Sequence, residues 1–314
     1  MPLALEPGLH PGGTSALGWL ALGAVLLAAV AALTHQHGRA WTASLLYVAV
    51  GLLLATGLEA LDVRWLDPLA HPDAIVRVCE LTLVVALFAN GVRLDRELSP
   101  AQWRSTTRLL LVAMPLTIAA VALLGAGLLG LSTGAAIVLG AALAPTDPVL
   151  AGDVGETAPG EDEPDAEFAI TSEASLNDGL AAPFMVLGLL VAGGDLGDAG
   201  SWASWVGVDL VLRCLLGLAA GVAVGAVAGR VAPGLRDRGY MTTAYDGILT
   251  AGLALVAFGA GEALGGYGFL SAFAAGVAFR RREAEHATHE EVHEGAARLE
   301  RLLELVVLLL VATS

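Results

Sequence analysis

The sequence is dominated by apolar stretches of about 20 residues without charged side chains, and these recur along most of its 314 residues. A helix needs about 20 residues to cross the hydrocarbon core of a bilayer. The hydrophobic content of 56% and the mean hydropathy of +0.72 are too high for an ordinary soluble domain. The sequence therefore predicts an all-α polytopic membrane protein.

Ten membrane spans are predicted, separated by short polar loops, within a single transmembrane domain that covers residues 1–314. They comprise residues 16–34, 42–59, 74–91, 107–130, 133–151, 168–192, 202–229, 241–260, 264–279 and 299–313. Thirteen arginines fall in one alternate set of loops and one arginine falls in the other set. By the positive-inside rule, this bias places the N-terminus outside and the loop 152–167 in the cytoplasm.

The formal net charge of −15 reflects several acidic segments, of which the loop 152–167 is the most concentrated. This loop is interpreted as a solvated linker, or alternatively as a surface that concentrates cations near a pore entrance. No basic patch interleaved with aromatic residues is present, so nucleic acid is not an expected partner. The sequence has no Gly-x-x-x-x-Gly-Lys loop for a nucleotide, and it predicts neither a cofactor nor an enzyme.

Several charged residues fall inside predicted spans, where each costs about 2.5–3.5 kcal/mol at the membrane centre and needs a partner or a purpose. They are Glu80, Asp147, Glu173, Asp178, Asp209, Arg213 and Asp246. The four-residue spacing of Asp209 and Arg213 predicts a structural ion pair on one helix face. Glu80 and Asp246 have no partner that the sequence identifies, and a packing hydrogen bond and a transport role stay open for both.

Asp147 lies between Pro145 and Pro148 at the end of an apolar run, in the motif Pro-Thr-Asp-Pro. The prolines remove backbone donors and interrupt a helix, which at membrane depth is tolerated only inside protein or beside a cavity. The carboxylate, the Thr146 hydroxyl and the freed carbonyl groups are oxygen ligands of the kind found at interrupted helices in secondary transporters. The motif therefore predicts a cation site, and a frayed helix end at the interface is the alternative.

A second polar group lies in the stretch 171–184, which reads TSEASLNDGLAAPF. Glu173 and Asn177 are four residues apart and share a helix face, with Asp178 one step around the helix. Desolvation favours the protonated form of a buried carboxyl group, and a bound cation favours the ionised form. Asp178 is therefore predicted to carry either a proton or a metal cation, which is the chemistry of an exchanger.

The motif TDPV (146–149) followed by SEASLNDG (172–179) resembles the NhaP-type sodium/proton antiporters of the cation:proton antiporter superfamily. The stretches 81–95 and 265–281 resemble two further spans of that family, so the resemblance runs from about residue 75 to the end. It implies an inverted-repeat helical bundle, a homodimer, and exchange of Na⁺, K⁺ or Li⁺ for H⁺. All sixteen basic residues are arginine, which is typical of a GC-rich bacterial genome, so the resemblance implies a bacterial inner-membrane protein with roles in pH and cation homeostasis.

The resemblance also implies a role for each matching residue. Asp178 is expected to be the principal carrier of the cation and the proton, and Asp147 and Thr146 are expected to bind the transported Na⁺ with it. Asn177 is expected to brace the site in place of a second aspartate found in electrogenic relatives, which implies electroneutral exchange. Glu173 matches an acidic residue that pairs with an arginine on a later helix.

Two departures from the family pattern affect these expectations. The family often has a serine where this sequence has Ala174, so one expected hydroxyl ligand is absent. The chain also stops at Ser314, within the tenth predicted span, whereas the family continues for about three more spans that include the arginine partner of Glu173. The sequence is therefore expected to lack the C-terminal spans of the domain.

Two other classes of protein use acidic residues in a membrane. A passive cation channel would need a filter of carbonyl groups or charged rings, and single protonatable sites suit it less well than alternating access. An intramembrane aspartyl protease would need Tyr-Asp followed by Gly-x-Gly-Asp. The sequence has Tyr245-Asp246, but the segment AGGD at 192–195 precedes it and lacks the first glycine.

Overall fold

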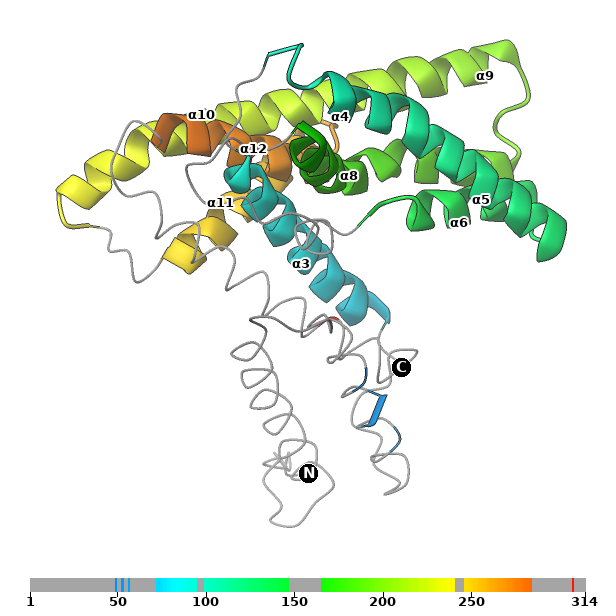
Figure 1. Cartoon of the computed structure of the whole chain (residues 1–314), viewed down its shortest axis with the longest axis horizontal. Helices are drawn as coiled ribbons and strands as arrows, with labels where there is room; N and C mark the ends of the chain where they lie inside the picture. The colour runs from blue at the N-terminus through cyan, green and yellow to red at the C-terminus, as the bar shows by residue number, and fades with distance from the viewer. Residues whose placement is uncertain are drawn as a thin grey trace, which may run out of the picture. The chain divides into compact units, whose positions relative to one another are not determined.

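The structure is a computed structural model that describes residues 49, 52–53, 56, 72–94, 99–146, 165–240, 246–283 and 307. The chain forms two compact units, one of residues 1–82 with 301–314 and one of residues 83–300. The helices in the described ranges are α3 (Pro72–Arg93), α4 (Arg104–Arg108), η1 (Leu109–Ala113), α5 (Met114–Leu128), α6 (Thr133–Leu143), α8 (Asp165–Gly193), α9 (Ala199–Ser204), η2 (Trp205–Leu212), α10 (Arg213–Asp237), α11 (Asp246–Ala263) and α12 (Gly268–Glu283). Figure 1 shows these helices along the chain.

Four continuous helical stretches are long and apolar enough to cross a membrane: Ile75–Arg93, Arg104–Leu128, Phe168–Gly193 and Ala199–Leu235. They confirm the third, fourth, sixth and seventh predicted spans. The second stretch joins α4, η1 and α5, and the fourth joins α9, η2 and α10. The fourth stretch has 37 residues, more than the 20 or so that a bilayer core requires. The protein is thus an all-helical membrane protein with at least four apolar spans.

Three shorter helices match further predicted spans, with shifted ends. The fifth span is represented by α6, the eighth by α11 and the ninth by α12. The last of these begins four residues later than predicted, because Gly265 adopts a positive φ of 76° and ends the preceding turn. The spans 16–34 and 299–313 lie outside the described residues, apart from residue 307, and so does nearly all of 42–59.

A stripe of glycines on α10 brings that helix into backbone contact with α12. Gly217, Gly221, Gly225 and Gly229 recur at every turn, and they face the backbones of Tyr267, Ser271, Ala275 and Phe279 respectively. A Cβ atom would overlap atoms of α12 at Gly221, Gly225 and Gly229, and atoms of Tyr267, just before α12, at Gly217. Small residues at four-residue spacing allow this close approach in membrane helices. The two helices lie side by side in Figure 1, with α12 in orange.

Similar close contacts surround α12 and α6. Gly91 of α3 packs against the backbone of α12 at Phe273 and Gly276. A Cβ at Gly134 of α6 would lie 2.6 Å from the Gly188 carbonyl oxygen of α8, and Gly140 of α6 packs on the backbone of Ile118 of α5. These contacts set α6 against both α5 and α8, and so fix where the end of α6 meets α8.

Candidate functional site

Helix α6 ends at Leu143, and Pro145 and Thr146 have no regular secondary structure. The amide of Ala144 still donates a helical hydrogen bond to Gly140, with a nitrogen to oxygen distance of 3.0 Å. Pro145 has no amide hydrogen and cannot continue this series, so the helix ends there. The structure thus shows that α6 ends before Pro145, and an interruption of a longer helix stays a prediction. Asp147 and Pro148 lie outside the described residues, and their roles stay predictions.

Three of the predicted site residues form one hydrogen-bonded cluster across the α6–α8 contact. The Thr146 hydroxyl donates to Oε2 of Glu173 at 3.0 Å. Nδ2 of Asn177 donates to Oγ1 of Thr146 at 2.8 Å and to Oε1 of Glu173 at 3.2 Å. Every donor in this cluster faces an acceptor, and both carboxylate oxygens of Glu173 receive a hydrogen bond. The end of α6 is thereby tied to one face of α8.

Asn177 is fully buried, and its Oδ1 atom has no hydrogen-bond partner within the described part of the chain. A buried polar atom without a partner costs about 1–3 kcal/mol, so such atoms are rare and call for an explanation. The amide nitrogen is fully used by Thr146 and Glu173. The cluster therefore presents one free oxygen acceptor, suited to a hydrogen-bond donor or to a hard cation.

Asp178 follows Asn177 in the same turn of α8 and is partly buried. The next residue, Gly179, is packed against α12, since a Cβ atom there would lie 2.9 Å from Cδ2 of Leu270. This turn of α8 therefore has the end of α6 on one face and α12 on another. Asp178 lies in that turn, and its role in ion binding stays a prediction.

A second set of buried contacts fixes α8 next to the site, and sequence analysis missed it. The hydroxyl groups of Thr106 and Ser172 lie 2.7 Å apart, and both residues are fully buried. Trp103 and Phe168 pack edge to face with ring centroids 5.3 Å apart. Thr106 belongs to α4 and Ser172 immediately precedes Glu173 on α8. A sequence does not reveal such a hydroxyl pair, because serine and threonine hydroxyls in a helix can equally bond to carbonyl groups of their own helix.

Two ion pairs account for three of the other charged residues of the spans, Glu80, Asp209 and Arg213. Arg213 and Asp209 form the predicted ion pair, with Nη1 and Oδ1 3.3 Å apart. Glu80, for which the sequence analysis found no partner, pairs with Arg77 at 2.7 Å between Nη1 and Oε2. The three-residue spacing of Arg77 and Glu80 is the sequence signal that identifies this ion pair. Asp246 is the first residue of α11, and its role stays a prediction.

The described residues contain no group of three or more His, Cys, Asp or Glu side chains that could hold a resident metal ion. The cluster instead offers hydroxyl, amide and carboxylate oxygens, which suit a weakly held hard cation.

Apolar helices of membrane-spanning length, with a polar cluster where one helix meets another, are features found in ion-transporting membrane proteins. The sequence profile of the family described as sodium/hydrogen exchanger, transmembrane, matches residues 16–313. The chain belongs to this family, which consists of transporters and not of enzymes.

Two fungal proteins are similar to the chain. A Na(+)/H(+) antiporter 2 of Zygosaccharomyces rouxii is 32% identical over 232 residues, which are 69% of this chain and 27% of the relative. A Na(+)/H(+) antiporter of Saccharomyces cerevisiae (strain ATCC 204508 / S288c) is 28% identical over 161 residues, which are 48% of this chain and 16% of the relative. The matched segments thus span roughly a quarter or less of these relatives.

Proposed function

We propose that this protein exchanges a monovalent cation, Na⁺ in the first instance, for H⁺ across a membrane. The observation that carries the proposal is the cluster of Thr146, Glu173 and Asn177, which joins the end of α6 to the turn of α8 that bears Asp178. Family membership supports it, as do the two fungal relatives named as Na(+)/H(+) antiporters.

In the proposed mechanism, Asp178 alternates between a bound proton and a bound cation. Deprotonated Asp178, the Thr146 hydroxyl and Asp147 supply oxygens to Na⁺, and protonation of Asp178 on one side of the membrane releases the cation there. Glu173 acts as a positioning residue, since both of its carboxylate oxygens accept hydrogen bonds from the cluster. Alternating access then carries either the cation or the proton, but not both together.

We further propose that the exchange is electroneutral and that the protein belongs to the NhaP-type, Asn-Asp subgroup. Asn177 is neutral, so a single titrating carboxylate at Asp178 moves one positive charge in each direction and no net charge per cycle. A homodimer in a bacterial inner membrane, with the N-terminus outside, completes the proposal. This orientation is supported by the loop arginines, thirteen against one.

The function is tested in everted membrane vesicles from cells that lack their own antiporters. Addition of Na⁺ to respiring vesicles should dissipate the pH gradient with the wild-type protein and leave it intact with Asp178→Asn. Asp209→Asn is the matched control, because that carboxylate forms an ion pair with Arg213. It should lower the amount of folded protein and leave exchange per molecule intact. Wild-type exchange by Asp178→Asn would refute the assignment.

Electroneutrality is tested with purified protein in liposomes, at a fixed pH gradient and with the membrane potential clamped by K⁺ and valinomycin. Moving one net charge would be driven by about 2.3 kcal/mol per 100 mV. The rate and end-point of Na⁺ exchange should therefore be independent of the clamped potential. An end-point that follows the voltage would show that a second carboxylate titrates in the cycle, with Asp147 or Glu173 as the candidates. A flux of Na⁺ that needs no counter-movement of H⁺ would instead indicate a channel.

A further inference from the structure

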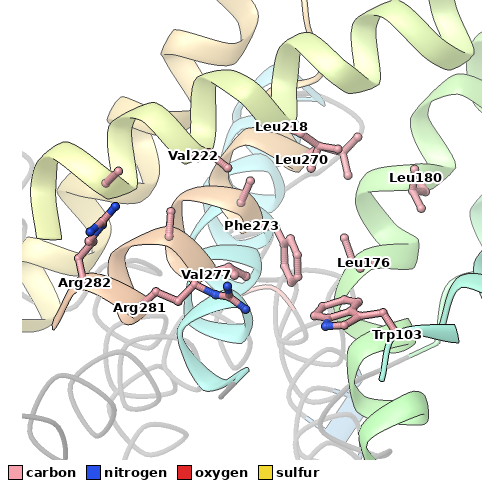
Figure 2. A pocket seen from close by; sticks show the side chains of 13 residues that line it. Trp103, Leu176, Leu180, Leu218, Val222, Leu270, Phe273, Val277, Arg281 and Arg282 are labelled. Carbon is pink, nitrogen blue, oxygen red and sulfur yellow. The ribbon is translucent and has the colours of Figure 1, made fainter. Parts of the chain in front are cut away.

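A large apolar cavity of about 790 Å³ lies among α8, α10 and α12, with one residue of the segment before α4 at its edge (Figure 2). Its walls are Leu, Val, Ala and Phe side chains, with Leu176 and Leu180 from α8, Val222 from α10 and Phe273 from α12 among them. Trp103 closes part of one end. Apolar walls of this kind favour hydrocarbon over water or ions.

The two ends of this cavity differ in charge. Figure 2 shows Arg281 and Arg282 at one end, and Leu176, Leu180 and Trp103 at the other. The two arginines are the last basic residues of α12, and both are exposed. None of the described residues that line the cavity is acidic. The cavity therefore has the polarity of an amphiphile with an anionic head and an apolar tail.

We propose that this cavity binds an anionic phospholipid of the surrounding membrane. Its phosphate contacts Arg281 and Arg282, and an acyl chain lies along Val222, Phe273 and Leu180. Basic pockets between membrane helices bind anionic lipid head groups, and arginine binds phosphate through its planar fork of donors. The acyl chain of the lipid covers the apolar walls of the cavity. A free phosphate ion has no apolar part and cannot cover them.

The position of this lipid gives it access to the ion site. Leu176 and Leu180 line the cavity, and they flank Asn177 and Asp178 on α8. An acyl chain in contact with these leucines packs against the helix that carries the proposed site. Lipid binding at this cavity does not depend on the proposed exchange, and the experiments below measure lipid binding alone.

Lipid binding is tested by native mass spectrometry of the full chain, delipidated in detergent and titrated with dioleoyl phosphatidylglycerol or dioleoyl phosphatidylcholine. The wild-type protein should retain the anionic lipid in preference to the zwitterionic one. Arg282→Gln should weaken phosphatidylglycerol binding about fivefold, and Arg281→Gln/Arg282→Gln should weaken it about 25-fold. Arg238→Gln is the matched control, since this exposed arginine does not line the cavity, and it should bind as the wild type does.

The apolar part is tested separately by filling the cavity. Val222→Trp should abolish binding of either lipid, whereas Val227→Trp, at an exposed α10 position outside the cavity, should not. Inorganic phosphate at millimolar concentration should not displace the lipid. The proposal is overturned by equal binding of the two lipids, by unchanged binding in the double arginine variant or in folded Val222→Trp, or by displacement with phosphate. Thermal unfolding of each variant establishes that it is folded.

Discussion

The α10–α12 contact and the α6–α8 contact both use glycine to bring helices close, yet they differ in what lies along them. The first repeats a glycine at four successive turns of α10, opposite the backbone of α12. The second has Gly134 against Gly188 at one end, and at the other end, where α6 stops, the cluster of Thr146, Glu173 and Asn177. Hydrogen-bonded polar side chains thus lie where α6 ends, and the α10–α12 pair packs through backbone and small residues.

This difference has an energetic meaning. Between membrane helices, association depends on van der Waals packing and interhelical hydrogen bonds, because lipid tails are as apolar as the side chains. The α10–α12 pair gains packing along its whole length and has no room for an added methyl group. The α6–α8 pair instead gains specific hydrogen bonds that hold chemical groups in place. Disruption of the α10–α12 packing should therefore lower the stability of the fold. Disruption of the α6–α8 hydrogen bonds should lower transport activity before it lowers stability.

The largest effect is expected from adding a methyl group to the glycine stripe. In Gly221→Ala the new Cβ overlaps the backbone of Ser271, which cannot move without displacing α12. Overpacking of this kind costs about 1–3 kcal/mol or more. The thermal unfolding midpoint and the yield of monodisperse protein should both fall.

Gly252→Ala on α11 is the matched control, because this glycine is exposed and has nothing within 4 Å of its Cβ position. Alanine is the better helix former by about 0.8–1 kcal/mol, so this change should be neutral or slightly stabilising. Equal loss of stability in the two variants would show that the stripe does not determine packing.

The next largest effect is expected from removal of the amide at the centre of the cluster. Asn177→Ala deprives both Thr146 and Glu173 of a hydrogen-bond donor inside the protein. A broken buried hydrogen bond to a charged group costs about 1.5–3 kcal/mol. Cation-dependent dissipation of the pH gradient should fall at least tenfold per folded molecule.

Thr107→Ala controls for the loss of a polar group from a span, because the Thr107 hydroxyl is exposed and bonds to the carbonyl of Trp103, the residue just before α4. Its exchange activity should match the wild type. An Asn177→Ala protein with normal exchange would mean that the cluster is structural and has no part in ion binding.

A smaller effect is expected at the hydroxyl pair that supports α8. Thr106→Val and Ser172→Ala each remove one partner of the 2.7 Å contact. A double-mutant cycle in thermal or denaturant unfolding should give a coupling energy of about 0.6–1.7 kcal/mol, the range of interhelical hydrogen bonds in membranes. Additive effects of the two substitutions would show that the hydroxyl groups do not support each other.

The smallest effect is expected at the N-terminus of α9, outside the apolar core. Oδ1 of Asp198 accepts a hydrogen bond from the Ser201 amide at 2.7 Å. This bond to the charged form lowers the pKa of Asp198 below its ordinary value of 3.8. A lowered pKa in the folded state means that the contribution is fully present above the ordinary pKa and is lost as the pH falls through the folded value.

Asp198→Ala should therefore speed amide hydrogen exchange at Ser201 at pH 7, where the carboxylate caps the helix. Asp195→Ala, in the same loop, should leave that exchange rate unchanged. An equal effect of the two substitutions would indicate a general charge effect and not a cap.

Much of this fold could be predicted from the lengths of the apolar stretches, which are read directly from the sequence. The spans 74–91, 107–130, 168–192 and 202–229 were predictable because a run of 20 apolar residues has few alternatives to a membrane helix. The pairing of Asp209 with Arg213 followed from helical spacing alone. The glycine stripe of α10 was visible as a four-residue repeat, but its partner was not, because a sequence does not state which helix lies opposite.

The members of the hydrogen-bonded cluster, Thr146, Glu173 and Asn177, could be named from the sequence, but the bonds between them could not. Proline chemistry indicated that a helix ends near Thr146, and the spacing of Glu173 and Asn177 indicated a shared face. Which hydroxyl, amide or carboxylate donates to which depends on the approach of α6 to α8, set by Gly134 and Gly188. The Thr106–Ser172 contact depends equally on tertiary packing, since the two residues are 66 positions apart in sequence.

The most direct test of the central claim measures Na⁺ binding to the purified protein together with the protons that binding releases. Isothermal titration in two weakly buffered solutions of different ionisation enthalpy gives both quantities. If Asp178 exchanges a proton for the cation, wild-type protein should release about one proton per Na⁺ bound below the pH at which the site is fully ionised. Asp178→Asn should bind no Na⁺ and release no proton. Unchanged Na⁺ binding by Asp178→Asn, or wild-type binding without proton release at any pH, would contradict the account.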